Sequence, residues 1–333
     1  MTGAAPAAGP TMSVAHAARE IARDIKLTHS VFALPFAALG AVYAAVYAAA
    51  HTATHAPGAA DAATAAARRG MDWRAFAVDA ALVVACMVCA RTAAMIANRL
   101  LDRELDARNP RTAGRAIPAG RLSVRAAAAG YALAGIGFVG CAALFGVLHG
   151  NWWPLALAVP VLAWISAYGL FKRFTALCHV WLGASLAISP PAAALAVNPD
   201  ALASAAPWLM SGMVLCWVAG FDIIYALQDV AVDQRDGLHS MPSRLGARRA
   251  MWVSRALHAA ALGFLVALWS AVPEFGALFG AAVALVAVLL VVEHATVHRW
   301  GTSRIAATFT TVNGAVSVAV GAAGVASLLQ AAS

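Results

Sequence analysis

Long apolar runs, repeated along almost the whole sequence, are the feature that most limits what this chain can fold into. A helix needs roughly 20 apolar residues to cross the hydrocarbon core of a bilayer. In lipid the backbone polar groups must be satisfied internally, and helices do this within one segment. Runs of about this length lie near residues 30–50, 76–97, 126–148, 153–170, 176–197, 204–227, 251–271, 275–292 and 305–329. The sequence therefore predicts an all-α integral membrane protein with about nine transmembrane helices.

Composition and charge support this class. The chain of 333 residues is 62% hydrophobic and only 11% charged, which excludes an ordinary soluble domain. Its net charge of +8 lies in loops between apolar runs, without a soluble module to carry it. We therefore expect contact with anionic membrane lipid and no nucleic-acid partner.

The distribution of Lys and Arg predicts the orientation. Basic residues precede the first run and follow the second, fourth, sixth and eighth runs. The loops at 149–152, 198–200 and 273–274 carry no Lys or Arg, although the first outer loop is an exception with Arg68, Arg69 and Arg74. The positive-inside rule then places the N-terminus in the cytoplasm of a bacterial cell, with the protein in the cytoplasmic (inner) membrane.

The N-terminal residues differ in composition from the rest. The first 14 are rich in Ala, Pro and Gly, which is typical of a disordered segment. They lack the apolar core of a signal peptide. We predict a disordered tail over residues 1–20 and one transmembrane domain over 21–333.

A first group of oxygen-bearing side chains ends the second apolar run. Asn98, Asp102 and Asp106 recur at i, i+4 and i+8, so they share one face of a helix. Such a stripe suits Mg²⁺, which usually binds through one or two carboxylates together with substrate phosphates. The alternative is a membrane-exit helix whose charges meet only solvent and lipid headgroups.

A second group ends the sixth run. Asp222, Tyr225, Asp229 and Asp233 follow spacings of 3, 4 and 4, which again make one helical stripe. Asp222 lies within the apolar run, where an unpaired carboxylate costs about 2.5 kcal/mol or more. A polar cavity or a partner would explain it. Because both stripes fall on the predicted cytoplasmic side, we expect two halves of one cation site facing the cytoplasm.

Basic residues accompany both stripes. Arg111 and Arg115 lie in a Pro- and Gly-marked loop after the first stripe, and guanidinium groups match phosphate oxygens well. Tyr168, Lys172 and Arg173 end the fourth run, and Lys26 precedes the first. Apart from phosphate binding, interface anchoring would explain Lys26, and an aromatic belt with a positive-inside pair would explain the other three.

These segments resemble a known family. Asn98-x-x-x-Asp102-x-x-x-Asp106, followed by Arg111-Thr112-Ala113-Gly114-Arg115 and Pro118-x-Gly120, is similar to the first motif of the UbiA superfamily of intramembrane aromatic prenyltransferases. Asp222-x-x-Tyr225-Ala226-x-x-Asp229-x-x-x-Asp233, followed by Gly237, Ser240 and Gly246, resembles its second motif, and Tyr168-x-x-x-Lys172-Arg173 resembles the basic element between them. The similarity runs from about Ile25 to Leu329 and is closest to the 4-hydroxybenzoate polyprenyltransferase branch.

The resemblance implies a fold and a reaction. It implies a helical bundle around a central cavity that opens to the cytoplasmic side. It also implies an Mg²⁺-dependent transfer of a polyprenyl group from a prenyl diphosphate to a ring carbon of an aromatic acid, as in quinone biosynthesis. Metal ligands would be Asn98, Asp102, Asp106, Asp229 and Asp233. Diphosphate would bind Arg111, Arg115, Tyr168, Lys172, Arg173 and Lys26. Asp102, Asp222, Tyr225 and Asp229 would be the catalytic residues.

Alternatives remain for the substrate and for the class of protein. Arg99 stands where the commonest pattern of that branch has Asp, and this resembles a sub-branch that prenylates 1,4-dihydroxy-6-naphthoate on the futalosine route to menaquinone. Haem O synthase, chlorophyll synthase and geranylgeranylglyceryl phosphate synthase are weaker matches. A cation-coupled membrane transporter is the alternative from a different class, since transporters also carry intramembrane carboxylates.

Overall fold

The structure, a computed structural model, describes residues 13–25, 32–52 and 72–332, and these residues contain helices and no strand. The helices that form the bundle are α2 (Leu34–Thr52), α4 (Trp73–Arg108), α5 (Val124–His149), α6 (Trp153–Phe171), α7 (Cys178–Ala187), α8 (Ser189–Val197), α9 (Ala206–Ala226), α12 (Ala247–Ala271), α13 (Ala277–Trp300) and α14 (Ile305–Ala332). The short elements are α1 (Val14–Asp24), η2 (Pro199–Ala203), η3 (Leu227–Asp229), α10 (Val230–Arg235), α11 (Met241–Leu245) and η4 (Gly301–Arg304).

Seven stretches of the described chain are long and apolar enough to cross a membrane. One of them, Cys178–Val197, contains both α7 and α8, and another, Ala277–Ala332, contains both α13 and α14. The apolar part of α2, Leu34–Ala50, is shorter. The prediction of an all-α membrane protein is confirmed, while the number of nine spans stays a prediction.

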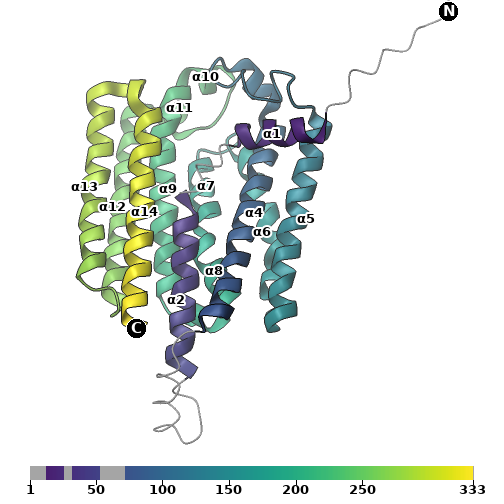
Figure 1. Ribbon diagram of the computed structural model, residues 1–333. Helices are drawn as coiled ribbons and strands as arrows, with labels where there is room; N and C mark the ends of the chain where they lie inside the picture. Colours follow the sequence, from purple (N-terminus) through teal and green to yellow (C-terminus); the bar gives the residue numbers. More distant parts are fainter. Residues whose placement is uncertain (1–12, 26–31, 53–71, 333) are drawn as a thin grey trace, which may run out of the picture.

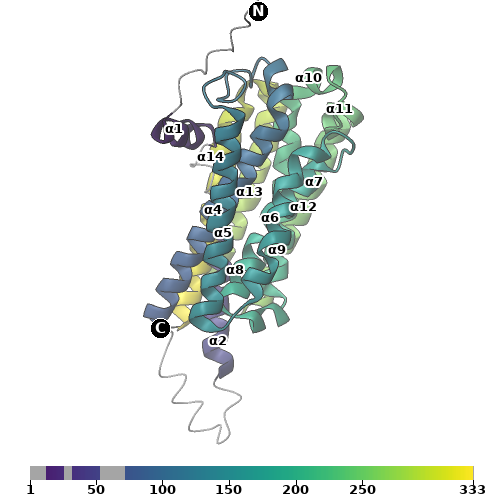
Figure 2. The ribbon, with the colours of Figure 1, turned by 90° about the vertical axis from the view of Figure 1, so that its right-hand side faces the viewer.

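The long helices run side by side in one bundle, and α1 lies across one of its ends (Figures 1 and 2). Helix α9 occupies the centre and packs against α2, α7, α8, α12 and α14. Its Trp217 is fully buried, together with Phe36 of α2, Leu265 of α12 and Phe279 of α13. Because α9 is held on several sides, the carboxylates at its end have a rigid support.

Helix α4 is long enough to carry the first acidic stripe beyond the apolar layer of a membrane. Asp72 caps its start, since its Oδ1 accepts hydrogen bonds from the backbone N–H groups of Arg74 and Ala75 at 3.0 and 3.2 Å. The helix has 36 residues, so at 1.5 Å per residue it is about 54 Å long, whereas the hydrocarbon core is about 30 Å thick. It ends at Arg108, just before Pro110, which cannot continue a helix. The excess length allows its final turns to emerge from the apolar layer.

The second acidic stripe is not one uniform α-helix, contrary to its expected spacing. Helix α9 ends at Ala226, the 3₁₀ turn η3 follows, and α10 begins at Val230. Here the side chain of Gln228 donates a hydrogen bond to the Tyr225 carbonyl oxygen at 3.1 Å. A 3₁₀ turn has three residues per turn, so it rotates later side chains relative to a continuous α-helix. The partners of Asp229 and Asp233 therefore cannot be inferred from the spacing of a regular α-helix.

The predicted tail also differs from what the structure describes. Residues 14–20 belong to helix α1, whose start is capped by the Ser13 hydroxyl. Its Ile21 packs on a small core that includes Ile25, Ile96 and Leu122. Burial of this apolar side chain supplies the stabilisation that the Ala-rich composition did not reveal. Residues 1–12 lie outside the described residues, so disorder there stays a prediction.

Candidate functional site

The two acidic segments and their basic loops lie at the same end of the bundle (Figure 1). The Arg235 guanidinium donates a hydrogen bond to the Arg108 carbonyl oxygen at 3.0 Å, and Arg108 Nε lies 3.8 Å from Asp236 Oδ2. These contacts tie the end of α4 to the end of α10. The expected proximity of the two segments is therefore a feature of the fold.

Asp102 is the buried centre of the first segment, with 2% of its surface exposed. Its Oδ2 accepts hydrogen bonds from Lys172 Nζ at 2.7 Å and from Asn98 Nδ2 at 2.9 Å. Arg173 Nη2 lies 3.8 Å from Asp102 Oδ1 and donates to the Leu101 carbonyl oxygen at 2.5 Å. The basic end of α6 thus meets the acidic end of α4.

Asp106 is held by its own loop. Arg115 Nη1 lies 2.7 Å from both carboxylate oxygens of Asp106. The Thr112 hydroxyl donates to the backbone carbonyl oxygen of Asp106 at 3.1 Å, and Gly120 (φ 73°) turns the chain back toward α5. Positive φ is easily adopted only by glycine. The loop therefore keeps a guanidinium beside the third member of the stripe.

Asp229 joins the second segment to the loop of the first. Arg111 donates to it twice, from Nε to Oδ1 at 3.0 Å and from Nη2 to Oδ2 at 2.5 Å. Asn109 Nδ2 donates to Oδ1 at 3.2 Å, and Arg111 Nη1 also donates to the Tyr225 hydroxyl at 3.2 Å. Bidentate pairing of this kind is the strong, geometrically specific form of an ion pair.

Asp233 is held by the loop that follows the second segment. Its Oδ2 accepts a hydrogen bond from the Ser240 hydroxyl at 2.5 Å, and Lys172 and Asp229 are within electrostatic range. The Lys172 carbonyl oxygen accepts the His239 backbone N–H at 2.7 Å. Lys172 therefore links α6, the first acidic segment and the loop that follows the second.

Asp222 pairs with a residue that the sequence analysis did not identify. His179 Nδ1 lies 2.7 Å from Asp222 Oδ2, and His179 Nε2 accepts the Met241 backbone N–H at 3.1 Å. One turn after His179 on α7, the helix approaches α9 closely: a Cβ added to Gly183 would lie 2.4 Å from the Leu215 carbonyl oxygen. An ionisable His within an apolar run was the available signal.

Arg99 was considered only as a departure from the family pattern, but it connects α1 to the site. Its Nε lies 3.4 Å from Asp24 Oδ2, and its Nη1 donates to the Asn98 side-chain oxygen at 3.2 Å. Tyr168 is partly buried and lies within electrostatic range of Asp102 and Asp222. Lys26, predicted to bind diphosphate, lies outside the described residues.

The predicted metal ligands do not form a ready-made cage. Within the described ranges, no group of three or more His, Cys, Asp or Glu side chains could hold a metal ion. The carboxylates are occupied instead by Lys172, Arg111, Arg115 and Ser240. The donor chemistry nevertheless fits Mg²⁺, because Asp102 Oδ1 is buried without a hydrogen-bond partner and all donors are oxygen. Mg²⁺ normally completes its octahedron with water and substrate phosphate.

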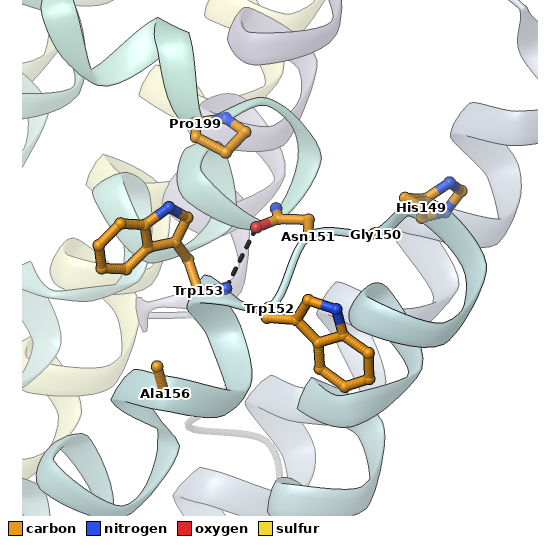
Figure 3. Close-up of a pocket in the computed structure, with 7 residues that line it drawn as sticks. All are labelled: His149, Gly150, Asn151, Trp152, Trp153, Ala156 and Pro199. Atoms are coloured by element: carbon orange, nitrogen blue, oxygen red, sulfur yellow. Dashed lines mark hydrogen bonds between the residues drawn. The ribbon is translucent and has the colours of Figure 1, made fainter.

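An open hollow at the opposite end of the bundle does not belong to this site. It is lined by His149, Gly150, Asn151, Trp152, Trp153, Ala156 and Pro199 (Figure 3). Asn151 organises it by accepting the Trp153 backbone N–H at 3.3 Å and donating to the Leu195 and Ala196 carbonyl oxygens. None of its lining residues is a carboxylate. Most of them lie in or next to the turn between α5 and α6.

Solved structures of other proteins superpose on most of this chain. A UbiA homologue from Aeropyrum pernix K1, known in its apo form, superposes with a TM-score of 0.72 and 30% sequence identity, covering 89% of this chain and 96% of that chain. A UbiA homologue from Archaeoglobus fulgidus, bound to GPP and Mg²⁺, superposes with a TM-score of 0.64 and 15% identity, covering 92% and 99%. At that identity the second likeness shows the fold alone.

Sequence relatives agree with the resemblance found in the motifs. The 4-hydroxybenzoate octaprenyltransferase of Paracidovorax citrulli (strain AAC00-1) is 35% identical over 157 residues, which are 47% of this chain and 50% of that protein. The mitochondrial 4-hydroxybenzoate polyprenyltransferase of Caenorhabditis elegans is 34% identical over 164 residues, 49% and 44% of the two chains. The match thus spans half or less of each of these curated relatives. Residues 56–315 match the UbiA prenyltransferase family, and the chain belongs to that family.

Proposed function

We propose that this chain transfers a polyprenyl group from a prenyl diphosphate to a ring carbon of an aromatic acid of the 4-hydroxybenzoate type. One observation carries the proposal: at one end of the bundle, both acidic segments are paired with basic residues from distant parts of the chain, with Arg111 on Asp229 and Lys172 on Asp102. A diphosphate with its bound cation likewise combines negative and positive charge, as these carboxylate–guanidinium and carboxylate–ammonium pairs do. It can therefore exchange partners with these ion pairs without leaving a buried charge uncompensated.

The donor would bind at the end of the bundle where these residues gather. Arg111, Arg115, Lys172 and Arg173 would take the diphosphate oxygens after releasing their carboxylates. Asn98, Asp102, Asp106, Asp229 and Asp233 would hold Mg²⁺, which neutralises diphosphate charge when bound. The isoprenoid tail, being a hydrocarbon, would lie along apolar helix faces open to membrane lipid.

The chain's own residues would favour departure of the diphosphate. As the bond between prenyl C1 and oxygen breaks, negative charge grows on the leaving group, and fixed guanidinium and ammonium groups stabilise that charge. The ring carbon ortho to the acceptor hydroxyl forms the new C–C bond, and loss of the ring proton restores aromaticity. Asp222 and Tyr225, which lie deeper along α9, would orient the acceptor or stabilise the allylic cation.

Two acceptors share this chemistry. 4-Hydroxybenzoate is favoured because that substrate class appears in the names of the matched relatives. 1,4-Dihydroxy-6-naphthoate is the alternative, favoured because Arg99 stands where the commonest pattern of the 4-hydroxybenzoate branch has Asp. Either product is a quinone precursor anchored in the membrane by its tail. The positive-inside rule supports a bacterial cytoplasmic membrane with the N-terminus and the site facing the cytoplasm.

A direct assay tests the proposal. Membranes containing the protein are incubated with a polyprenyl diphosphate and either aromatic acid, and the product is identified by mass spectrometry. We expect C-prenylated acid, its loss on adding EDTA and its return with Mg²⁺. Absence of product with both acceptors would contradict the proposal. Solute uptake by proteoliposomes without consumption of prenyl diphosphate would instead favour the cation-coupled transporter.

A further inference from the structure

His179 is a buried polar residue whose two ring nitrogens both have partners. It lies at the start of α7 and is 3% exposed. Nδ1 is 2.7 Å from Asp222 Oδ2 on α9, and Nε2 is 3.1 Å from the Met241 backbone nitrogen at the start of α11. Three elements that are distant in the chain therefore meet at one imidazole.

The partners determine which nitrogen carries the proton. The Met241 backbone N–H can only donate, so Nε2 must accept and is unprotonated. The ring proton of neutral His179 is then on Nδ1, which donates to the Asp222 carboxylate. Adding a second proton would break the contact to Met241. This arrangement holds the imidazole in one tautomer and fixes the plane of the carboxylate.

The other oxygen of Asp222 is left for another partner. Among the residues that the structure describes, Asp222 Oδ1 makes no hydrogen bond. This oxygen is not fully buried. The Asp222 side chain is 18% exposed. Tyr225 lies one helical turn further along α9, and Tyr168 lies within electrostatic range. The Asp222 carboxylate thus has one oxygen free to accept a hydrogen bond, with Tyr225 and Tyr168 in its surroundings.

The chemistry of C-alkylation needs such an acceptor position. A ring carbon ortho to a hydroxyl becomes more nucleophilic as the hydroxyl donates its hydrogen more strongly, and a carboxylate is a strong hydrogen-bond acceptor. Its effect depends on being held in the productive orientation before the substrate arrives. His179 supplies that constraint to Asp222.

We propose that His179 is a positioning residue, which aims Asp222 Oδ1 at the ring hydroxyl of the aromatic acceptor and ties this carboxylate to the start of α11 through Met241. The role rests on the proposed function. It concerns the acceptor and not the diphosphate, since within the described part of the chain His179 makes no hydrogen bond to Arg111, Arg115 or Lys172.

Steady-state kinetics on the full-length protein in membranes test the role. His179→Leu removes both contacts, whereas His179→Asn retains an amide N–H near the position of Nδ1. For His179→Leu we expect kcat/KM for the aromatic acid to fall about tenfold or more, with KM for the prenyl diphosphate unchanged. His179→Asn should recover most of the loss. Ser185→Ala, on the same helix and with its hydroxyl bonded to the Trp181 carbonyl oxygen, is the matched control and should resemble the wild type.

A double variant separates positioning from simple support of the fold. If His179 acts through Asp222, adding His179→Leu to Asp222→Asn should lower the rate no further, because the two changes then share one effect. Multiplying losses, or an equal rise in KM for both substrates, would overturn the role. Wild-type protein that forms no prenylated acid would refute the proposed function itself, and the role with it; active wild type with unaffected His179 variants would refute only the role.

Discussion

Arg111 binds both oxygens of Asp229 across 118 sequence positions, with Nε–Oδ1 and Nη2–Oδ2 distances of 3.0 and 2.5 Å. The pair links the loop after the first acidic segment to the end of the second. Partial burial would lower the pKa of the Arg111 guanidinium, but the hydrogen bonds and charge of Asp229 outweigh it and raise this pKa. The diphosphate of the proposed donor would therefore have to compete with a well-formed internal anion.

The two carboxylates that meet basic partners from distant elements should be essential. We expect Asp102→Asn and Asp229→Asn each to lower the rate of prenyl transfer by about 100-fold or more, because charge fixed around a leaving group has effects of that order. Glu104→Gln is the matched control: it lies on the same helix as Asp102, and its side chain is 80% exposed. Product formation at saturating substrates measures the effect, with thermal unfolding as a check on folding. Near-normal rates in either Asp variant would remove that residue from the site.

Lys172 should govern the donor more than the acceptor. Its Nζ contacts Asp102 and lies within electrostatic range of Asp233. Lys172→Met should raise KM for the prenyl diphosphate by about 10-fold or more, the order expected for one charged hydrogen bond. Lys172→Arg retains the charge and should lose less. Arg125→Met, an exposed basic residue on α5, controls for the loss of a positive charge; an equal effect there would indicate general attraction rather than a specific contact.

Gly183 should be required for the close packing of α7 on α9. An added Cβ would lie 2.4 Å from the Leu215 carbonyl oxygen, which is backbone and cannot rotate away. Gly183→Ala should cost about 1–3 kcal/mol in the free energy of unfolding, as overpacking usually does, and it should lower activity by moving His179 from Asp222. Gly140→Ala, where the added atom meets nothing within 4 Å, should have neither effect. Thermal unfolding and product formation measured on both variants decide the matter.

A buried polar network behind the site should matter for stability. Trp217 Nε1 donates to the Asn313 side-chain oxygen at 2.9 Å, and Asn313 Nδ2 donates to Glu293 Oε1 at 2.8 Å. Asn313→Leu leaves both partners unsatisfied and should lower the free energy of unfolding by about 1–3 kcal/mol or more. Glu293→Gln retains an oxygen acceptor for Asn313 and should be tolerated better. Chemical unfolding in detergent measures both; equal losses would mean that the carboxylate charge itself is needed.

Docking of α1 should depend on pH through Glu20. A hydrogen bond from Arg121, 2.8 Å from Nε to Oε2, lowers the pKa of this carboxyl below its ordinary value of 4.5. The folded state therefore binds this proton less readily than the unfolded state. The contribution of Glu20 is present above pH 4.5 and is lost as the pH falls through the lower folded pKa. Hydrogen exchange of the α1 backbone amides should accelerate over that range, and Glu20→Gln should remove this part of the dependence. Exchange that is the same in both proteins at every pH would contradict it.

The sequence by itself determined the membrane-spanning helical class, the positions of the two acidic segments and the family resemblance. These depend on local properties: the length of apolar runs, helical periodicity and the residues that end a helix, such as Pro110 after α4. The set of five metal ligands was implied by the family resemblance, and its role in binding Mg²⁺ stays a prediction.

Only the tertiary structure decided which charges meet. Periodicity places Asp222 on a face of α9, but the partner His179 is brought there by the close approach of α7 at Gly183. Likewise, Arg111 reaches Asp229 because the ends of α4 and α10 lie together. Such contacts depend on the distance and rotation between helices distant in the chain, which packing sets and which no local pattern of residues encodes.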